Sequence, residues 1–308
     1  MTDIKVAELS LELNIDIAVD LTTHTGTENR FGIFTQRCAP IQLNFLGYPG
    51  TSGSKSIDYI ISDKTVIPKN NQKFYSEKIV YMPNSYHPIE NLKKISEKKF
   101  SRKELNLPED KFIFCCFNSH QKITPSIFNI WIDLLKKNSN SVLWLREFNQ
   151  YSSKNLKLEA SKKGLDEKRI IFAKRVPLDE HLVRIKNADL FLDTFPYTAH
   201  STCSDVLRIG LPVLTFMGES FTSRVSASFL HTMMIPELIT TSYEEYEKLA
   251  NKIANDKDYL NNLKNKILEN KTKSPLYDIK LFTKNLEKAY FLMFEKYVKS
   301  EETNNIEI

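Results

Sequence analysis

The sequence lacks long apolar runs, metal-type cysteine spacing and a leader pattern. Its 308 residues contain no apolar run near the roughly 20 residues of a membrane-spanning helix, so we expect no membrane span. The amino-terminal segment is mixed and acidic from Asp3 onward, without the basic start and apolar core of a signal peptide. The four cysteines show no metal-ligand spacing. These absences favour a cytoplasmic protein with reduced thiols.

A strong imbalance of charge is also missing. Lysine and arginine number 43 against 38 aspartates and glutamates, which gives a formal net charge of +5. This balance suits an anionic ligand without demanding one, and much of the lysine lies in scattered pairs such as Lys136–Lys137. A nucleic-acid binder more often carries a basic stripe interleaved with aromatic residues. We therefore expect no nucleic-acid partner.

Two phosphate-binding signatures are absent as well. No strand-like segment is followed by G-x-G-x-x-G, and G-x-x-x-x-G-K-[ST] does not occur, so neither the usual dinucleotide loop nor a P-loop is supported. The acidic D-x-D that often marks a metal site in sugar transferases occurs only at Asp256–Lys257–Asp258. That triplet lies between two helical patterns, which predicts a helix N-cap turn. We therefore expect neither a metal nor a cofactor.

What is present is the length and composition of an ordinary soluble protein with room for two domains. Hydrophobic residues make up 41% and charged residues 26% of the chain. One helical pattern opens the chain, and residues 91–111 are strongly charged, which predicts a linker with a short helix. Between them, β-branched content and segment length predict four strands, at residues 15–21, 41–46, 57–62 and 78–83.

From Phe112 onward, strand and helix patterns alternate regularly. Five such alternations argue for a parallel sheet covered on both faces. Residues 242–299 are almost wholly helical by pattern, and we expect the tail after them to be frayed. The predicted strands are 112–117, 141–145, 169–173, 189–193 and 212–216, and the helices are 125–137, 151–164, 177–188 and two that begin near Ser201 and Ser223.

Polar and basic side chains follow these strands. Because ligands bind beyond the carboxyl ends of the strands in an open parallel sheet, these side chains predict an anion site at one edge. Ser201 and Thr202 open a helix, where unpaired N–H groups hold phosphates well, and Asp205 lies one turn further in. The alternative is that Ser201 or Thr202 merely caps the helix. The basic side chains concerned are His120, Lys122, Lys174, Arg175, His181, Arg184 and His200.

Several long motifs stand out, of which the clearest are "LGYPGTSG", from Leu46, and "LDTFPYTAHSTCSDVL", from Leu192. They resemble the catalytic region of the protein O-GlcNAc transferase/SPINDLY family, glycosyltransferase family 41. The likeness covers nearly the whole chain from about residue 15 to 298. It is carried by residues 39–63, 75–86, 140–145, 192–228 and 274–290.

The resemblance implies an α/β protein of GT-B type, with two Rossmann-like domains and carboxyl-terminal helices. We expect a partial first domain at 1–95, a nucleotide-sugar-binding domain at 96–272, and a returning helix with a frayed tail at 273–308. The implied activity is metal-independent, inverting transfer of a sugar, usually GlcNAc from UDP-GlcNAc, to Ser or Thr hydroxyls of proteins. UDP-sugar is then a co-substrate, and acceptor proteins are partners.

The resemblance also assigns roles to individual residues. Lys122 matches the lysine that steadies the leaving diphosphate. Asp205 matches the ribose-binding aspartate. The matches at the phosphates are His200, Ser201 and Thr202; those around the uracil are Val176, His181 and Arg184; and those in the glycine-rich loop facing the donor are Gly47 and Pro49.

The chain also departs from the family. Ser201 replaces a more usual threonine, Gln121 an aromatic residue, and Leu178 a lysine that can reach the ribose. This sequence does not contain the family's opening strands of the first domain, nor the tetratricopeptide array that usually selects protein substrates. We do not interpret His24 as the general base. Two alternatives therefore stay open: a nucleotide-sugar-binding fragment or pseudoenzyme, and an enzyme that uses another donor such as a GDP-sugar.

Overall fold

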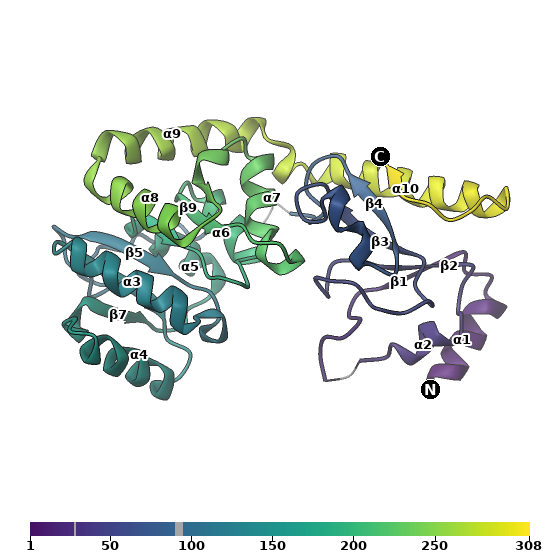
Figure 1. Ribbon diagram of the computed structural model, residues 1–308, viewed down its shortest axis with the longest axis horizontal. Helices are drawn as coiled ribbons and strands as arrows, with labels where there is room; N and C mark the ends of the chain where they lie inside the picture. Colours follow the sequence, from purple (N-terminus) through teal and green to yellow (C-terminus); the bar gives the residue numbers. More distant parts are fainter. Residues whose placement is uncertain (28, 90–94) are drawn as a thin grey trace. The chain divides into compact units, whose positions relative to one another are not determined.

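The computed structural model describes residues 1–27, 29–89 and 95–308, and the chain forms two compact units (Figure 1). Unit 1 comprises Met1–Glu90, Ser220–Thr222 and Pro275–Ile308, and unit 2 comprises Asn91–Glu219 and Ser223–Ser274. The expected domain limits stay a prediction, because compactness alone does not establish that a unit folds independently. No helix in the described part of the chain has the length and apolar character needed to cross a membrane.

Unit 1 is built on a five-stranded parallel sheet in the order β1-β2-β3-β4-β11. The opening helix and all four strands predicted before residue 95 are confirmed, because each strand is an apolar run bounded by turn residues. Its helices are α1 (Asp3–Glu12), α2 (Gly32–Thr35) and α10 (Ile279–Val298). Its strands are β1 (Ile17–Asp20), β2 (Ile41–Asn44), β3 (Tyr59–Asp63), β4 (Lys78–Met82) and β11 (Ile306–Glu307).

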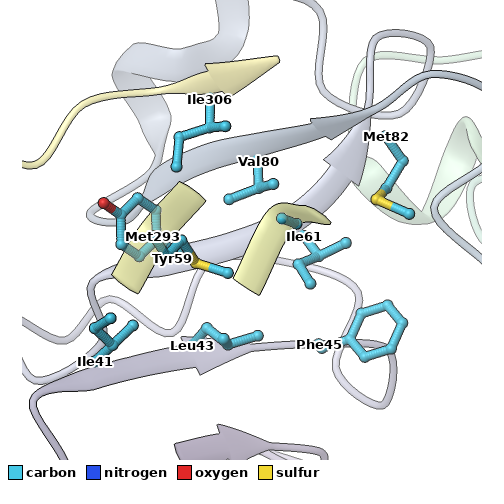
Figure 2. Packing of buried hydrophobic residues seen from close by; sticks show 10 residues of the cluster. Ile41, Leu43, Phe45, Tyr59, Ile61, Val80, Met82, Met293 and Ile306 are labelled. Carbon is cyan, nitrogen blue, oxygen red and sulfur yellow. The ribbon is translucent and has the colours of Figure 1, made fainter. Parts of the chain in front are cut away.

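The core of unit 1 joins residues that are far apart in the sequence. Leu43 and Val80 are fully buried on neighbouring parts of the sheet, and Ala289 and Met293 of α10 pack against the same cluster (Figure 2). Fully burying a side chain of this kind stabilises a fold by about 1.5–3 kcal/mol. The carboxyl-terminal helix is therefore part of this core.

The expectation of a frayed tail is wrong. Strand β11 pairs in parallel with β4, with Ile306 opposite Val80, and Ile306 is only 5% exposed. The Asn305 side chain accepts a hydrogen bond from the Ile79 N–H at 2.7 Å. The tail is polar in composition, but two contacts keep it ordered. Ile306 buries its side chain in the core, and the Asn305 amide satisfies a backbone N–H of β4.

Unit 2 holds a six-stranded parallel sheet in the order β10-β9-β8-β5-β6-β7. All five strands predicted after residue 111 are confirmed, and helix 125–137 is confirmed to the residue. The strands are β5 (Phe112–Cys116), β6 (Ser141–Arg146), β7 (Ile170–Ala173), β8 (Leu190–Leu192), β9 (Val213–Phe216) and β10 (Ile239–Thr240). The helices are α3 (Pro125–Lys137), α4 (Gln150–Lys162), α5 (Leu178–Arg184), α6 (Ser201–Arg208), α7 (Val225–Thr232), α8 (Tyr243–Asn255) and α9 (Lys257–Lys273).

Short 3-10 turns connect these elements. They are η1 (Lys69–Phe74), η2 (His120–Lys122), η3 (Glu167–Arg169), η4 (Ile185–Asn187), η5 (Phe221–Ser223), η6 (Pro236–Leu238) and η7 (Pro275–Tyr277). The predicted N-cap turn between α8 and α9 is confirmed, because the Asp256 carboxylate accepts from the Tyr259 N–H at 2.9 Å.

The short helix expected within residues 91–111 is wrong for the described part, residues 95–111, and residues 91–94 lie outside the description. The chain turns here instead: the Leu107 N–H donates to the Arg102 carbonyl at 2.8 Å, and Asn106 has a positive φ of 55°. The Arg102 guanidinium then bonds the Lys111 carbonyl at 2.8 Å and the Asp189 carboxylate at 3.0 Å. These bonds hold the segment in a series of turns rather than a helix.

Candidate functional site

The strand order of unit 2 reverses between β5 and β8. One half of the sheet runs from β5 through β6 to β7, and the other runs from β8 through β9 to β10. The segments that leave the carboxyl ends of these two strands are therefore neighbours, at the place where ligands bind in open parallel sheets. These segments contain Lys122 on one side and the predicted phosphate cluster, residues 194–205, on the other.

A buried carboxylate joins the two segments. Asp193, directly after β8, is 1% exposed and accepts from the Asn118 side-chain amide at 3.0 Å. It also accepts from the Ala199 N–H at 2.7 Å and from the Thr215 hydroxyl at 2.8 Å. Burial raises the pKa of Asp193, whereas the hydrogen bonds donated to it lower that pKa. Asp193 thus holds the ends of β5, β8 and β9 together beneath the loop.

Sequence reasoning assigned no role to Asp193. The available signal was an acidic residue that ends a fully apolar strand, because an aspartate there is buried and must find several donors. Asn118, which follows β5 at the predicted carboxyl edge and is 4% exposed, is one of these donors.

Lys122 lies at the end of η2, against this loop. Its ammonium donates to the Thr198 carbonyl at 2.9 Å and sits 3.9 Å from the centre of the Tyr197 ring. Burial lowers the pKa of Lys122, and the nearby Asp193 carboxylate opposes that shift. An ammonium has three N–H donors, so its bond to Thr198 leaves capacity for an anionic ligand.

The start of α6 follows the same loop. His200, not Ser201 or Thr202, is the N-cap residue, and its side chain makes no capping hydrogen bond but stacks on Tyr197 at 4.9 Å. The simple capping alternative for Ser201 and Thr202 is therefore wrong. Ser201 is exposed, and Thr202 and Asp205 are half-buried, so solvent reaches two residues of the first turn of α6 and the carboxylate one turn further in.

A second part of the site is a cavity of about 580 Å³ beyond β6 and β7. It brings together Val176, His181 and Arg184, the residues expected around the base, although their contact with a base stays a prediction. The remaining lining residues are Arg146, Arg175, Pro177 and Leu178. Sequence reasoning missed Arg146, because an arginine that ends an apolar strand reads as the solvated end of that strand.

His181 is held neutral in this cavity. Burial, Arg184 and Arg146 lower its pKa to about 4. The Arg184 Nε–H donates to His181 Nδ1 at 3.1 Å, so the ring proton of the neutral imidazole lies on Nε2. Phe117 packs edge-on against the ring with 4.8 Å between the centroids. A neutral, fixed imidazole can pack on a flat ligand and donate one hydrogen bond to it.

Gly47 and Pro49 belong to unit 1, after β2, and their expected role toward the donor stays a prediction. The structure supplies another reason for the glycine. A Cβ atom on Gly47 would lie 1.6 Å from the Leu21 carbonyl oxygen, so only glycine lets this loop pass the loop after β1.

We expect Gly47→Ala to destabilise the protein by about 1–3 kcal/mol, because backbone rather than a flexible side chain would have to move. Gly50→Ala is the matched control in the same loop, since its Cβ would meet only the Tyr48 ring at 3.3 Å. Urea unfolding monitored by circular dichroism measures both. If both variants unfolded at the same urea concentration, the close approach of Gly47 to the Leu21 carbonyl would not be the reason that this position requires glycine.

Another cavity, of about 830 Å³, lies at the opposite edge of the unit 2 sheet. In its lining, the Asp189 carboxylate binds Arg102 at 3.0 Å and Lys264 at 3.4 Å. Parallel sheets do not bind their ligands at this edge, so we assign the site to the carboxyl edge. Among the described residues, no group of three or more His, Cys, Asp or Glu side chains could hold a metal ion.

Comparison with known proteins identifies relatives of the whole chain. The family model described as Glycosyl transferase family 41 matches residues 3–100 and 94–286. The Arabidopsis thaliana protein SEC, named a probable UDP-N-acetylglucosamine–peptide N-acetylglucosaminyltransferase, is 34% identical over 315 residues, covering 100% of this chain and 32% of its own length. The Petunia hybrida protein SPINDLY, also named a probable UDP-N-acetylglucosamine–peptide N-acetylglucosaminyltransferase, is 31% identical and covers 95% of this chain and 31% of its own length.

Solved structures agree with the sequence relatives. A mutant of the Thermobaculum terrenum O-GlcNAc transferase superposes with a TM-score of 0.89 at 27% identity, covering 97% of this chain and 57% of the other. An Anabaena protein, HepE, solved with UDP, has a TM-score of 0.63 at 16% identity, covering 94% and 81%, and supports the fold alone. The expected GT-B fold class is confirmed. The chain spans about a third of the length of the curated relatives it matches.

Proposed function

The chain belongs to glycosyltransferase family 41, and we propose that it transfers GlcNAc from UDP-GlcNAc to Ser or Thr hydroxyls of proteins. The observation that carries the proposal is the meeting of Lys122 with the loop before α6 at the switch point of a parallel sheet. That arrangement suits a nucleoside diphosphate, and the curated relatives are named for UDP-GlcNAc.

In the proposed reaction, the acceptor oxygen attacks the anomeric carbon from the face opposite the leaving group. The bond between that carbon and the diphosphate oxygen breaks, its electrons pass to the diphosphate, and the configuration inverts. Charge therefore develops on the diphosphate, where fixed cations and N–H dipoles lower the barrier. Lys122 supplies the ammonium, and Ser201 and Thr202 at the start of α6 supply N–H dipoles and hydroxyls.

The other residues hold the donor. Asp205, one turn into α6, accepts from ribose hydroxyls, and the cavity with Val176, His181 and Arg184 takes the uracil. The proposal needs no metal, since Lys122 and the helix start meet the charge that a divalent cation meets elsewhere. The acceptor hydroxyl passes its proton to water as the new bond forms.

Two measurements test the proposal. Titration calorimetry is expected to show binding of UDP and UDP-GlcNAc to the chain, and absence of UDP binding would overturn the pocket assignment. Mass spectrometry of Ser/Thr peptides incubated with UDP-GlcNAc is expected to show a gain of one N-acetylhexosamine. Binding without any transfer would instead identify a nucleotide-sugar-binding module.

A further inference from the structure

The cavity beyond β6 and β7, which contains Val176, His181 and Arg184 and is called the base cavity below, offers only hydrogen-bond donors among its polar side chains. Arg146, Arg175 and Arg184 each carry a guanidinium group, which has five N–H donors and no acceptor. His181 is the only other polar side chain in the lining, and its Nδ1 acceptor is already occupied by the Arg184 Nε–H. Its remaining ring atom, Nε2, is a donor. A ligand in this cavity must therefore present acceptors.

Two of the guanidinium groups, those of Arg146 and Arg175, form no ion pair with a carboxylate among the described residues. Arg146 ends β6 opposite Ala173 of β7, and Arg175 follows two residues later. Arg184, by contrast, bonds the Lys174 carbonyl at 2.6 Å. Partial burial lowers the pKa of Arg146, and the neighbouring Arg175 lowers it further. Arg146 is half-buried with its guanidinium 4.2 Å from the centre of the Phe148 ring, and Arg175 is exposed, so the two like charges lie where a ligand with hydrogen-bond acceptors would compensate them.

We propose that Arg146 and Arg175 are specificity-determining residues that select a nucleotide with a keto base, uracil or guanine, over one with an amino base. The inference rests on the proposed function, because it assumes that this cavity takes the base of the donor. Uracil presents a carbonyl oxygen where cytosine presents an amino group, and guanine differs from adenine in the same way. An arginine N–H can donate a hydrogen bond to the carbonyl oxygen. Opposite an amino group, two donors face each other, and neither the arginine nor the amino group finds an acceptor.

Uracil and cytosine are the sharpest pair for a test, because they have nearly the same size and the same stacking face. A site whose donors match one base rejects the other strongly, since the mismatched groups lose their water without gaining a bond. We expect the chain to bind UDP at least about tenfold more tightly than CDP, the equivalent of one good hydrogen-bonded pair.

The experiment measures the dissociation constants of UDP, CDP, GDP and ADP by calorimetry on the full chain and on the double variant Arg146→Gln/Arg175→Gln. A glutamine amide offers both a donor and an acceptor, so it serves either base. The UDP-to-CDP preference is expected to fall to about twofold or less in the double variant. The control Lys163→Gln/Lys168→Gln removes two exposed charges from the same unit outside the cavity and is expected to keep the ratio.

The outcomes separate this inference from the proposed function. Equal binding of UDP and CDP by the unaltered chain overturns the inference alone, as does a double variant that weakens all four nucleotides equally. Absence of binding by all four overturns the proposed function and the inference with it. Comparison of UDP with GDP then tells which keto base the cavity accepts. Thermal unfolding of the double variant checks that it is folded, and Arg146→Gln alone repeats the ratio test if it is not.

Discussion

Lys122→Ala is expected to lower the rate of sugar transfer by about 10²–10³-fold, the usual effect of removing one preorganised charge from a leaving group. UDP affinity is expected to fall only a few-fold. The ammonium contacts the Thr198 carbonyl in the free protein, so its interaction with the ligand strengthens chiefly as negative charge develops on the departing diphosphate. The measurement pairs peptide mass spectrometry at fixed UDP-GlcNAc with UDP calorimetry.

The matched control for this experiment is Lys136→Ala. Lys136 is exposed on α3 of the same unit and lies outside the site. Its substitution by alanine removes the same charge without altering the loop before α6. Unchanged transfer by Lys122→Ala would refute the assigned role. An equal loss of UDP affinity and of transfer would instead mean that Lys122 binds the ground state and the transition state alike.

Asp193→Ala is expected to destabilise unit 2 by at least about 3 kcal/mol, as for a buried charged group removed from its partners. The carboxylate accepts from Asn118, Thr194, Ala199 and Thr215 at 2.7–3.0 Å, and all of these donor residues are buried. Each donor left without an acceptor loses its hydration without compensation. Urea unfolding measures the loss, and UDP binding by the folded fraction should disappear with the loop geometry.

Asp193→Asn is the control that keeps the shape. Its Oδ1 atom still accepts from the Asn118 side-chain amide and from the Thr194 and Ala199 N–H groups. The Thr215 hydroxyl can rotate to accept from the new amide. We expect a loss of about 1–2 kcal/mol, clearly smaller than for alanine. Equal destabilisation by asparagine and alanine would mean that the negative charge, rather than the set of hydrogen bonds, holds the loop.

Local chemistry explains which elements sequence reasoning could place. Thr124 accepts from the Ile127 N–H at the start of α3, and Pro125 occupies the first turn, so the signals for that helix lie within a few residues. The tail, by contrast, is ordered by Ile306 in a core more than two hundred residues away along the chain. Windowed patterns carry no information about such a partner.

The sequence by itself determined the alternation of strands and helices, the family, and the identity of Lys122, His200, Ser201 and Thr202 as a candidate phosphate site. Periodicity and helix-start chemistry are local, and long motifs are specific, so neither needs coordinates. Only the tertiary structure decided that β5 lies beside β8, because strand order depends on which apolar surfaces pack together. It also revealed the hydrogen bonds that Asp193 accepts beneath the loop and the place of Arg146 in the cavity beyond β6 and β7, since burial and hydrogen-bond partners arise only when distant segments meet.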